Sequence, residues 1–142
     1  MEENKQQKNI ETIREILQDE VEGRVQAALD KMDPDYKMTW VYRRRDGALF
    51  PSEKINRKEQ LEDTYKIQGR EYKINRILAD DNTVMAEMSE SYPDPKTGKI
   101  YLTPMMMVWE FENGKIRRGR HYCDPQLSYE NLTEDQINSL YK

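Results

Sequence analysis

Apolar residues recur at spacings of three and four through the first third of the chain, and this period predicts helix. The positions on this stripe are Ile10, Ile13, Ile16, Leu17, Val21, Val25, Ala28, Leu29 and Met32. Gly23 interrupts it and is a candidate break between two helices, because glycine costs a helix about 1 kcal/mol relative to alanine. We expect Asp33-Pro34 to end the helical region, since a residue before proline avoids helical geometry.

The pattern then changes to a period of two, which is typical of strands. One strand with an aromatic face is predicted over Tyr36, Met38, Trp40 and Tyr42. A short helix is expected near residues 56–65, where Asn56 and Glu59 have the spacing of a capping box.

The second half alternates in the same way and predicts four consecutive antiparallel strands. Their ranges are residues 72–79, 83–92, 99–112 and 115–124. Asn113-Gly114 is a strong hairpin signal, because both positions tolerate a positive φ. A final short helix is expected from Thr133, with Gln136 at the capping-box position.

This order of helices, strand, helix and four strands predicts an α+β domain in which helices cover one face of an antiparallel sheet. A length of 142 residues suits one domain. We therefore assign residues 1–142 to a single domain with a polar tail at residues 1–8. A curved sheet covered by helices leaves a cavity between the layers, which is a usual place for a small-molecule site.

Strand parity predicts which side chains face that cavity. In residues 83–92 the set that includes Met88 is apolar apart from Glu90, so this face is expected to point inward. A carboxylate there needs a cation or a hydrogen-bond donor nearby. In residues 115–124 the charged set prefers solvent, which puts Gly119, His121 and Cys123 inside. His121 is the only histidine of the chain, and Gly119 beside it leaves room for a ligand.

The predicted pocket is lined mainly by aromatic and methionine side chains. Beside Glu90 and His121, the candidate ligand-pocket residues are Tyr36, Trp40, Tyr42, Met88, Tyr101, Met105, Met107, Trp109, Gly119 and Cys123. The methionines are expected to fill space rather than bind metal, because thioethers bind hard metals poorly. Two interpretations of the aromatic residues at 36, 40 and 42 are equally open: they line a pocket for a flat ligand, or they only pack in the core.

Composition narrows the expected partners and location. A formal net charge of −4 gives no overall attraction to nucleic acid or to an anionic membrane. The arginine-rich residues 43–45 and 117–120 are expected to pair with acidic residues or form a subunit contact rather than bind RNA. A single cysteine forms no internal disulfide and suits a reducing cytoplasm, and residues 1–9 lack the apolar segment of a secretory signal. No apolar run approaches the ~20 residues of a membrane helix.

A resemblance to a known family rests on two segments, WEFENGKI at residues 109–116 and RHYCD at residues 120–124, which follow the helices and the aromatic strand. Over residues 8–128 the chain resembles the nuclear-transport-factor-2-like superfamily, and more narrowly its SnoaL-like polyketide cyclase and limonene-epoxide-hydrolase branch. The resemblance implies a cone-shaped α+β barrel, in which a curved, mostly antiparallel sheet wraps around the N-terminal helices. It also implies a homodimer through the outer sheet face, where Arg118, Arg120 and Tyr122 lie.

The same resemblance points to site residues. In enzymes of the family the residue before the tyrosine of the last strand is often a pocket aspartate acting as acid or base, and here it is His121. Epoxide-hydrolase-like members carry an Arg-x-Asp pair on the facing strand, and here those positions resemble Met88-Ser89-Glu90. The arginine is missing, so epoxide hydrolysis is disfavoured and a pair of His121 and Glu90 becomes the catalytic candidate.

A histidine beside a carboxylate can move protons near neutral pH, because imidazole has an ordinary pKa of about 6.5. We expect His121 to be the general acid or base, with Glu90 orienting it or working opposite to it. The pair can remove a proton alpha to the carbonyl of a small hydrophobic compound, as in cyclisation, isomerisation or dehydration without a cofactor. The alternative is a structural histidine in the inert pocket of a ligand-binding or protein-interaction domain.

Cys123 and metal binding are weaker candidates. Cys123 lies about 6.5 Å along the strand from His121, which is too far for a direct hydrogen bond, so a small buried hydrophobe is expected. One histidine, one cysteine and Glu90 lack the spacing of metal ligands, and we expect no metal site.

Overall fold

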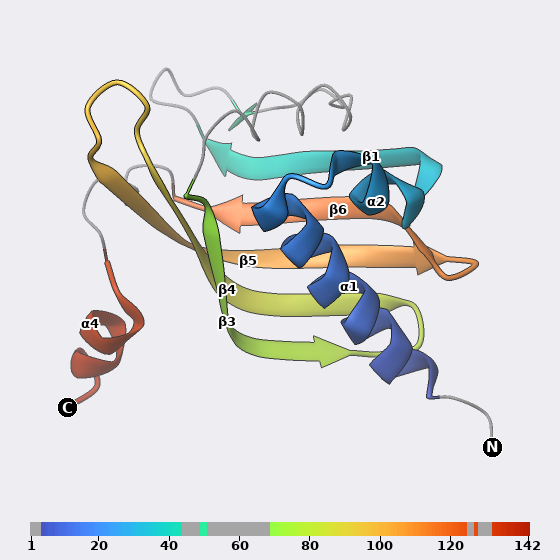
Figure 1. Ribbon diagram of the computed structural model, residues 1–142. Coiled ribbons are helices and arrows are strands. Elements are labelled where there is room, and N and C mark those ends of the chain that lie inside the picture. Colours follow the sequence, from blue (N-terminus) through green and yellow to red (C-terminus); the bar gives the residue numbers. More distant parts are fainter. Residues whose placement is uncertain (1–3, 44–48, 51–68, 125–126, 128–131) are drawn as a thin grey trace.

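The computed structural model describes residues 4–43, 49–50, 69–124, 127 and 132–142, and the backbone alone of residues 42, 43, 49 and 50 (Figure 1). The helix predicted near residues 56–65 therefore lies outside the described residues. The same holds for the side chain of Tyr42 and for those of the arginines at residues 43–45.

The first third is helical and breaks where the sequence predicts. α1 spans Lys5–Glu22 and α2 spans Val25–Asp30. The side chain of Asn4 accepts hydrogen bonds from the backbone N–H groups of Gln6 and Gln7, which caps the first turn. Gly23 ends α1 at a φ of 76°, a left-handed conformation that glycine adopts without the penalty of a Cβ.

The strands form one six-stranded sheet in the order β2-β1-β6-β5-β4-β3 (Figure 1). Their bounds are β1 Met32–Arg43, β2 Leu49–Phe50, β3 Glu71–Ala79, β4 Thr83–Pro93, β5 Ile100–Glu112 and β6 Lys115–Cys123. Consecutive strands from β3 to β6 pair antiparallel, which confirms the predicted meander, whereas β1 runs parallel to β6. Asn113 and Gly114 join β5 to β6 with φ values of 52° and 78°, as the hairpin signal predicted.

The end of the helical region differs from the prediction. Lys31 closes α2, and Met32 already begins β1. Pro34 therefore lies inside a strand rather than at a helix end. The register of β1 with β6 shifts between Met32 and Lys37, so the missing N–H group of Pro34 falls where the ladder is interrupted.

α1 crosses one face of the sheet, and the main core lies between these two layers (Figure 1). Ile13 and Ile16 of α1 are buried together with inward-facing Val84 and Ala86 of β4. Near the C-terminus α4 spans Glu134–Ser139, with the predicted capping box at its start. Helices packed on a mostly antiparallel sheet confirm the α+β class, while the cone shape stays a prediction.

A buried ion cluster fixes the junction of α1 and α2. Asp19 is 4% exposed, and its Oδ1 accepts a hydrogen bond from Nε of Arg24 at 2.9 Å while Oδ2 accepts one from Nζ of Lys31 at 2.7 Å. Burial opposes the charge of the Asp19 carboxyl, but hydrogen bonds from Lys31 and Arg24 outweigh it and lower its pKa. This cluster lies outside the cavity described below and serves the structure.

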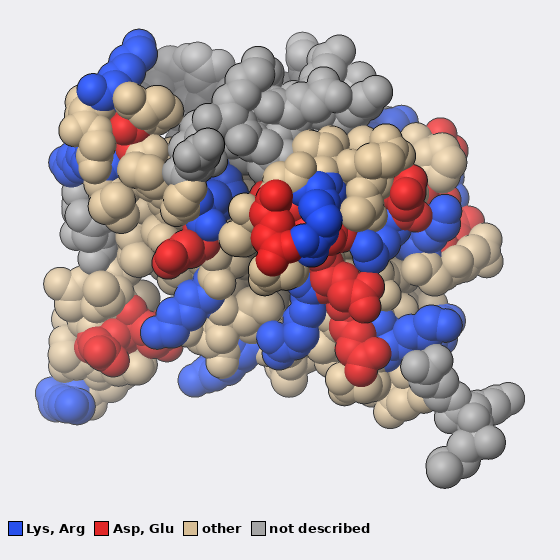
Figure 2. All heavy atoms as spheres, viewed as in Figure 1, with Lys and Arg blue, Asp and Glu red and all other residues tan. Residues whose placement is uncertain are grey.

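On the face that α1 crosses, acidic and basic side chains are interspersed (Figure 2).

None of the helices that the structure describes is long and apolar enough to span a membrane.

Candidate functional site

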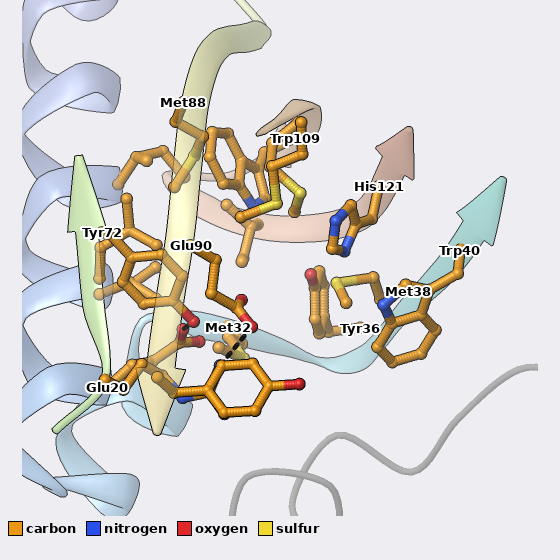
Figure 3. A pocket seen from close by; sticks show the side chains of 18 residues that line it. Glu20, Met32, Tyr36, Met38, Trp40, Tyr72, Met88, Glu90, Trp109 and His121 are labelled. Carbon is orange, nitrogen blue, oxygen red and sulfur yellow. Dashed lines mark hydrogen bonds and ion pairs between the residues drawn. The ribbon is translucent and has the colours of Figure 1, made fainter. Parts of the chain in front are cut away.

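A cavity of about 290 Å³ lies between α1 and the inward face of the sheet (Figure 3). Its lining comes from α1, from residue 70 and from strands β1, β3, β4, β5 and β6. Most of this wall is apolar or aromatic. Among the described residues the charged or titratable side chains at the wall, tyrosines aside, are Glu20, Arg70, Glu90 and His121.

The cavity brings together most of the side chains that strand parity had placed inward. Those at its wall are Tyr36, Trp40, Met88, Glu90, Met105, Met107, Trp109 and His121. Tyr101, Gly119 and Cys123 are absent from the described wall. Tyr101 instead donates a hydrogen bond to Asp94 and packs edge-on against Tyr92, with ring centroids 5.5 Å apart. That these residues bind a ligand stays a prediction.

The space above Gly119 is filled by a side chain of the protein itself. A Cβ atom at Gly119 would lie 2.4 Å from the hydroxyl oxygen of Tyr36 and 3.4 Å from Cγ of Met38. Tyr36 is 7% exposed and forms part of the cavity wall. The glycine thus gives room to Tyr36, and not directly to a ligand as expected from the sequence.

His121 projects from β6 toward the cavity and is half-buried (Figure 3). The parallel pairing of β1 with β6 sets it opposite Trp40, and the two ring centroids lie 6.2 Å apart at an angle of 39°. On its other side β5 sets Met107 opposite. On the two neighbouring strands an indole and a thioether therefore flank the imidazole.

A direct pair of His121 and Glu90, as expected from the sequence, would suit neighbouring strands, but β5 lies between β4 and β6. His121 pairs with Met107 of β5 and Glu90 pairs with Thr103, four residues away along that strand. On a flat sheet these offsets put the two Cα atoms about 10 Å apart across the strands and about 13 Å apart along them. The two side chains reach one cavity from different sides and are not neighbours on adjacent strands.

Glu90 meets a cation instead. Nη1 of Arg70, the residue just before β3, donates a hydrogen bond to Oε1 of Glu90, and Arg70 is 7% exposed. The guanidinium carbon lies 4.7 Å from the centroid of the Tyr92 ring, within the range of a cation–π contact. Burial opposes the charge of the guanidinium, but Glu90 and Tyr72 outweigh it and raise the pKa of Arg70. Arg70 therefore stays cationic.

α1 adds a second carboxylate near Glu90. Glu20 is 3% exposed, and its Oε2 accepts a hydrogen bond from the hydroxyl of Tyr72 at 2.9 Å. β3 in turn sets Tyr72 opposite Glu90, so this bond joins the helix to the sheet. We call the cluster of Glu20, Arg70, Tyr72 and Glu90 the polar end of the cavity.

Sequence reasoning missed three members of the polar end, although each left a signal. Glu20 lies four residues after Ile16, on the buried stripe of α1. Arg70 and Tyr72 have the parity of the inward-facing residues of β3. A charged residue on an otherwise apolar face is the sign that could have identified Glu20 and Arg70. In space, Arg70 pairs with Glu90 although the two residues lie 20 positions apart in the chain.

Cys123 is half-buried and packs against the core. Burial, with the nearby Glu90 and Asp124 carboxylates, raises the pKa of the Cys123 thiol to about 12. Such a thiol is protonated at neutral pH and is a poor nucleophile. Within the described ranges no three His, Cys, Asp or Glu side chains are grouped so as to hold a metal ion.

Comparison with known proteins bears on the fold. No family model and no curated protein matches the chain, but solved structures do. An LEH-like epoxide hydrolase from M. tuberculosis is 18% identical, with 97% of this chain and 98% of that chain covered at a TM-score of 0.69. A protein assigned as a SnoaL-like polyketide cyclase from Jannaschia is 10% identical, with 87% and 90% covered at 0.68. An NTF2-like protein of unknown function from Cytophaga hutchinsonii is 14% identical, with 83% and 91% covered at 0.63.

These likenesses show that the chain has the nuclear-transport-factor-2-like fold, as the sequence resemblance implied. At such low identity they show the fold alone, and one fold hosts many unrelated activities. A function therefore has to be argued from the cavity and its side chains.

Proposed function

We propose that the protein is an acid–base enzyme for a small, mostly hydrophobic carbonyl compound and works without a cofactor. Cyclisation, isomerisation and dehydration of such compounds share one step, the removal of a proton from the carbon alpha to the carbonyl. The observation that carries the proposal is one mostly apolar cavity of about 290 Å³ with both Glu90 and His121 at its wall. Two proteins of similar fold, an epoxide hydrolase and a polyketide cyclase, support a small-molecule enzyme.

In this proposal Glu90 and His121 divide the chemistry, because they approach the cavity from different sides. The Glu90 carboxylate takes the alpha proton and leaves an enolate, and the protonated imidazole of His121 gives a proton to a second atom of the substrate. Proton exchange with solvent then restores both groups. Arg70 balances the charge of Glu90 in its buried setting, and the apolar wall holds the hydrocarbon part of the substrate.

Deuterium exchange tests this step without knowledge of the natural substrate. A panel of small ketones that includes benzylacetone is incubated with the protein in deuterium oxide, and loss of the alpha-proton signal is followed by proton NMR. We expect exchange above the buffer rate, lowered about tenfold or more by Glu90→Gln. Glu87→Gln, on the outer face of β4, is the matched control and should not lower it.

Two outcomes contradict the proposal: ketones that bind but exchange only at the buffer rate, or exchange that Glu90→Gln leaves unchanged. Since Glu90→Gln leaves Arg70 without its ion-pair partner, circular dichroism must show that the variant is folded. Glu90→Asp keeps the charge on a shorter side chain. This variant takes the place of Glu90→Gln in the assay if Glu90→Gln does not fold.

A non-catalytic ligand-binding or protein-interaction domain is the alternative. The ion pair of Arg70 and Glu90 favours it, because a carboxylate engaged with an arginine can serve structure alone. In that case Glu90→Gln lowers stability, and no ketone in the panel exchanges faster than in buffer.

We also propose a homodimer through the outer sheet face, in a cytoplasmic setting and without a nucleic-acid partner. On that face Tyr122 and Met106 are 40% and 37% exposed, and Arg120 donates a hydrogen bond to Glu110 at 2.8 Å. A second copy would cover this apolar surface. Size-exclusion chromatography with light scattering should give twice the chain mass for the parent protein and the mass of a monomer for Tyr122→Glu. A parent protein that is monomeric at high concentration contradicts the dimer.

A further inference from the structure

The polar end of the cavity holds a hydrogen-bond donor for which the described residues supply no acceptor. Nε of Arg70 is buried and has no hydrogen-bond partner among them. Nη1 of the same guanidinium is taken by Glu90. A buried donor without an acceptor costs about 1–3 kcal/mol, so a ligand that brings an acceptor to this edge gains a comparable amount.

Local packing fixes Arg70 at the cavity wall. Gly69 precedes it at a φ of 85°, and a Cβ there would lie 3.1 Å from Cδ of Pro93. The guanidinium lies against the ring of Tyr92 and is bound by Glu90. Turn, ring and carboxylate together orient the guanidinium, so a ligand meets a fixed group rather than a flexible one.

The charges of the polar end restrict which acceptor fits. Among the described lining residues Arg70 carries a positive charge, whereas Glu20 and Glu90 are two carboxylates. Glu90 already balances Arg70, and Glu20 adds a negative charge. A carboxylate ligand would meet this excess of like charge in a buried site, while a neutral carbonyl oxygen would not.

We propose that Arg70 determines specificity by binding the neutral carbonyl oxygen of the substrate and by disfavouring carboxylates through the surrounding acids. This inference rests on the proposed function and orients its substrate. The carbonyl lies against Arg70 and Glu90, and the hydrocarbon part extends toward Trp40 and His121. The alpha carbon then lies close to the Glu90 carboxylate, and the guanidinium stabilises the charge that develops on the oxygen as the proton leaves.

Three probes of similar length separate the contributions: benzylacetone carries a ketone, hydrocinnamate a carboxylate, and butylbenzene no polar group. The two tryptophans of the chain, Trp40 and Trp109, both line the cavity, so their fluorescence reports binding. At neutral pH we expect benzylacetone to bind about tenfold or more tightly than hydrocinnamate. Equal or tighter binding of hydrocinnamate overturns the inference.

Arg70→Lys isolates the guanidinium, because lysine keeps the positive charge beside Glu90 but lacks Nε. We expect this variant to bind benzylacetone about tenfold more weakly and to bind butylbenzene as the parent protein does. Arg76→Lys, at an exposed position of β3, is the control and should change neither affinity. Arg70→Met combined with Glu90→Gln removes both charges and replaces Arg70→Lys if that variant does not fold.

The outcomes distinguish this inference from the proposed function. If benzylacetone and butylbenzene both bind but Arg70→Lys alters neither, the role of Arg70 is wrong while the cavity stays a ligand site. If no probe binds, butylbenzene included, the proposed function and this inference both fall. If the binding pattern is as expected but no ketone exchanges deuterium, the specificity of Arg70 holds and the catalytic role does not.

Discussion

Gly119→Ala should destabilise the protein by crowding Tyr36. The new Cβ would lie 2.4 Å from Oη of Tyr36 and 3.3 Å from Cζ, whereas non-bonded heavy atoms prefer a separation of about 3.5 Å or more. Tyr36 is 7% exposed, so its ring cannot simply turn into solvent and has to shift toward the cavity. Overpacking of this kind costs about 1–3 kcal/mol, which corresponds to a Tm lowered by about 4–12 °C.

Urea unfolding followed by circular dichroism measures this loss. Tyr36→Phe removes the crowded oxygen, so the double variant with Gly119→Ala should recover most of the loss as a coupling energy in a double-mutant cycle. Arg118→Ala, at the adjacent and exposed position, should change the free energy of unfolding by only about 0.5 kcal/mol. If Gly119→Ala unfolds at the same urea midpoint as the parent protein, Tyr36 does not fill the space above Gly119.

Two further predictions concern titratable groups. Asp19→Asn should lower the free energy of unfolding by about 1.5–3 kcal/mol, since charge-assisted hydrogen bonds to Arg24 and Lys31 are lost. These cations lower the pKa of Asp19, so the parent should keep this stabilisation above about pH 4 and lose it as the pH falls through the lowered pKa. The free energy of unfolding should therefore fall more steeply with acid in the parent than in Asp19→Asn, and an equally steep fall in both would refute the prediction. The pKa of the Cys123 thiol is raised to about 12, so little of it is thiolate at about pH 8. Cys123 should therefore react with a thiol reagent such as DTNB a hundredfold or more slowly than free cysteine at that pH. A rate near that of free cysteine would contradict the prediction and show that the thiol is accessible.

The sequence predicted local features well where one face of an element is buried. Apolar spacing predicted α1, and Gly23 marked its end because no other residue adopts a left-handed cap so readily. Parity placed Glu90 and His121 at the wall of one cavity, since alternation along a strand leaves only two faces to choose from.

Strand pairing was harder to predict, because it joins segments far apart in the chain. The parallel contact of β1 with β6, which sets Trp40 opposite His121, has no local signal. The expectation that Glu90 and His121 lie on neighbouring strands was wrong for a simpler reason: in a meander each strand pairs with the next, so β5 lies between them. Arg70 precedes both β3 and the strand predicted over residues 72–79, so alternation along that strand did not place its side chain.

A crystal structure of the protein with benzylacetone bound would show directly whether Glu90 and His121 act on one molecule held in this cavity. We expect the ligand between α1 and the sheet, with atoms within about 4.5 Å of both side chains and its carbonyl oxygen nearer to Glu90 than to His121. A ligand bound outside the cavity, or inside it but in contact with only one of the two residues, would show that Glu90 and His121 do not act together.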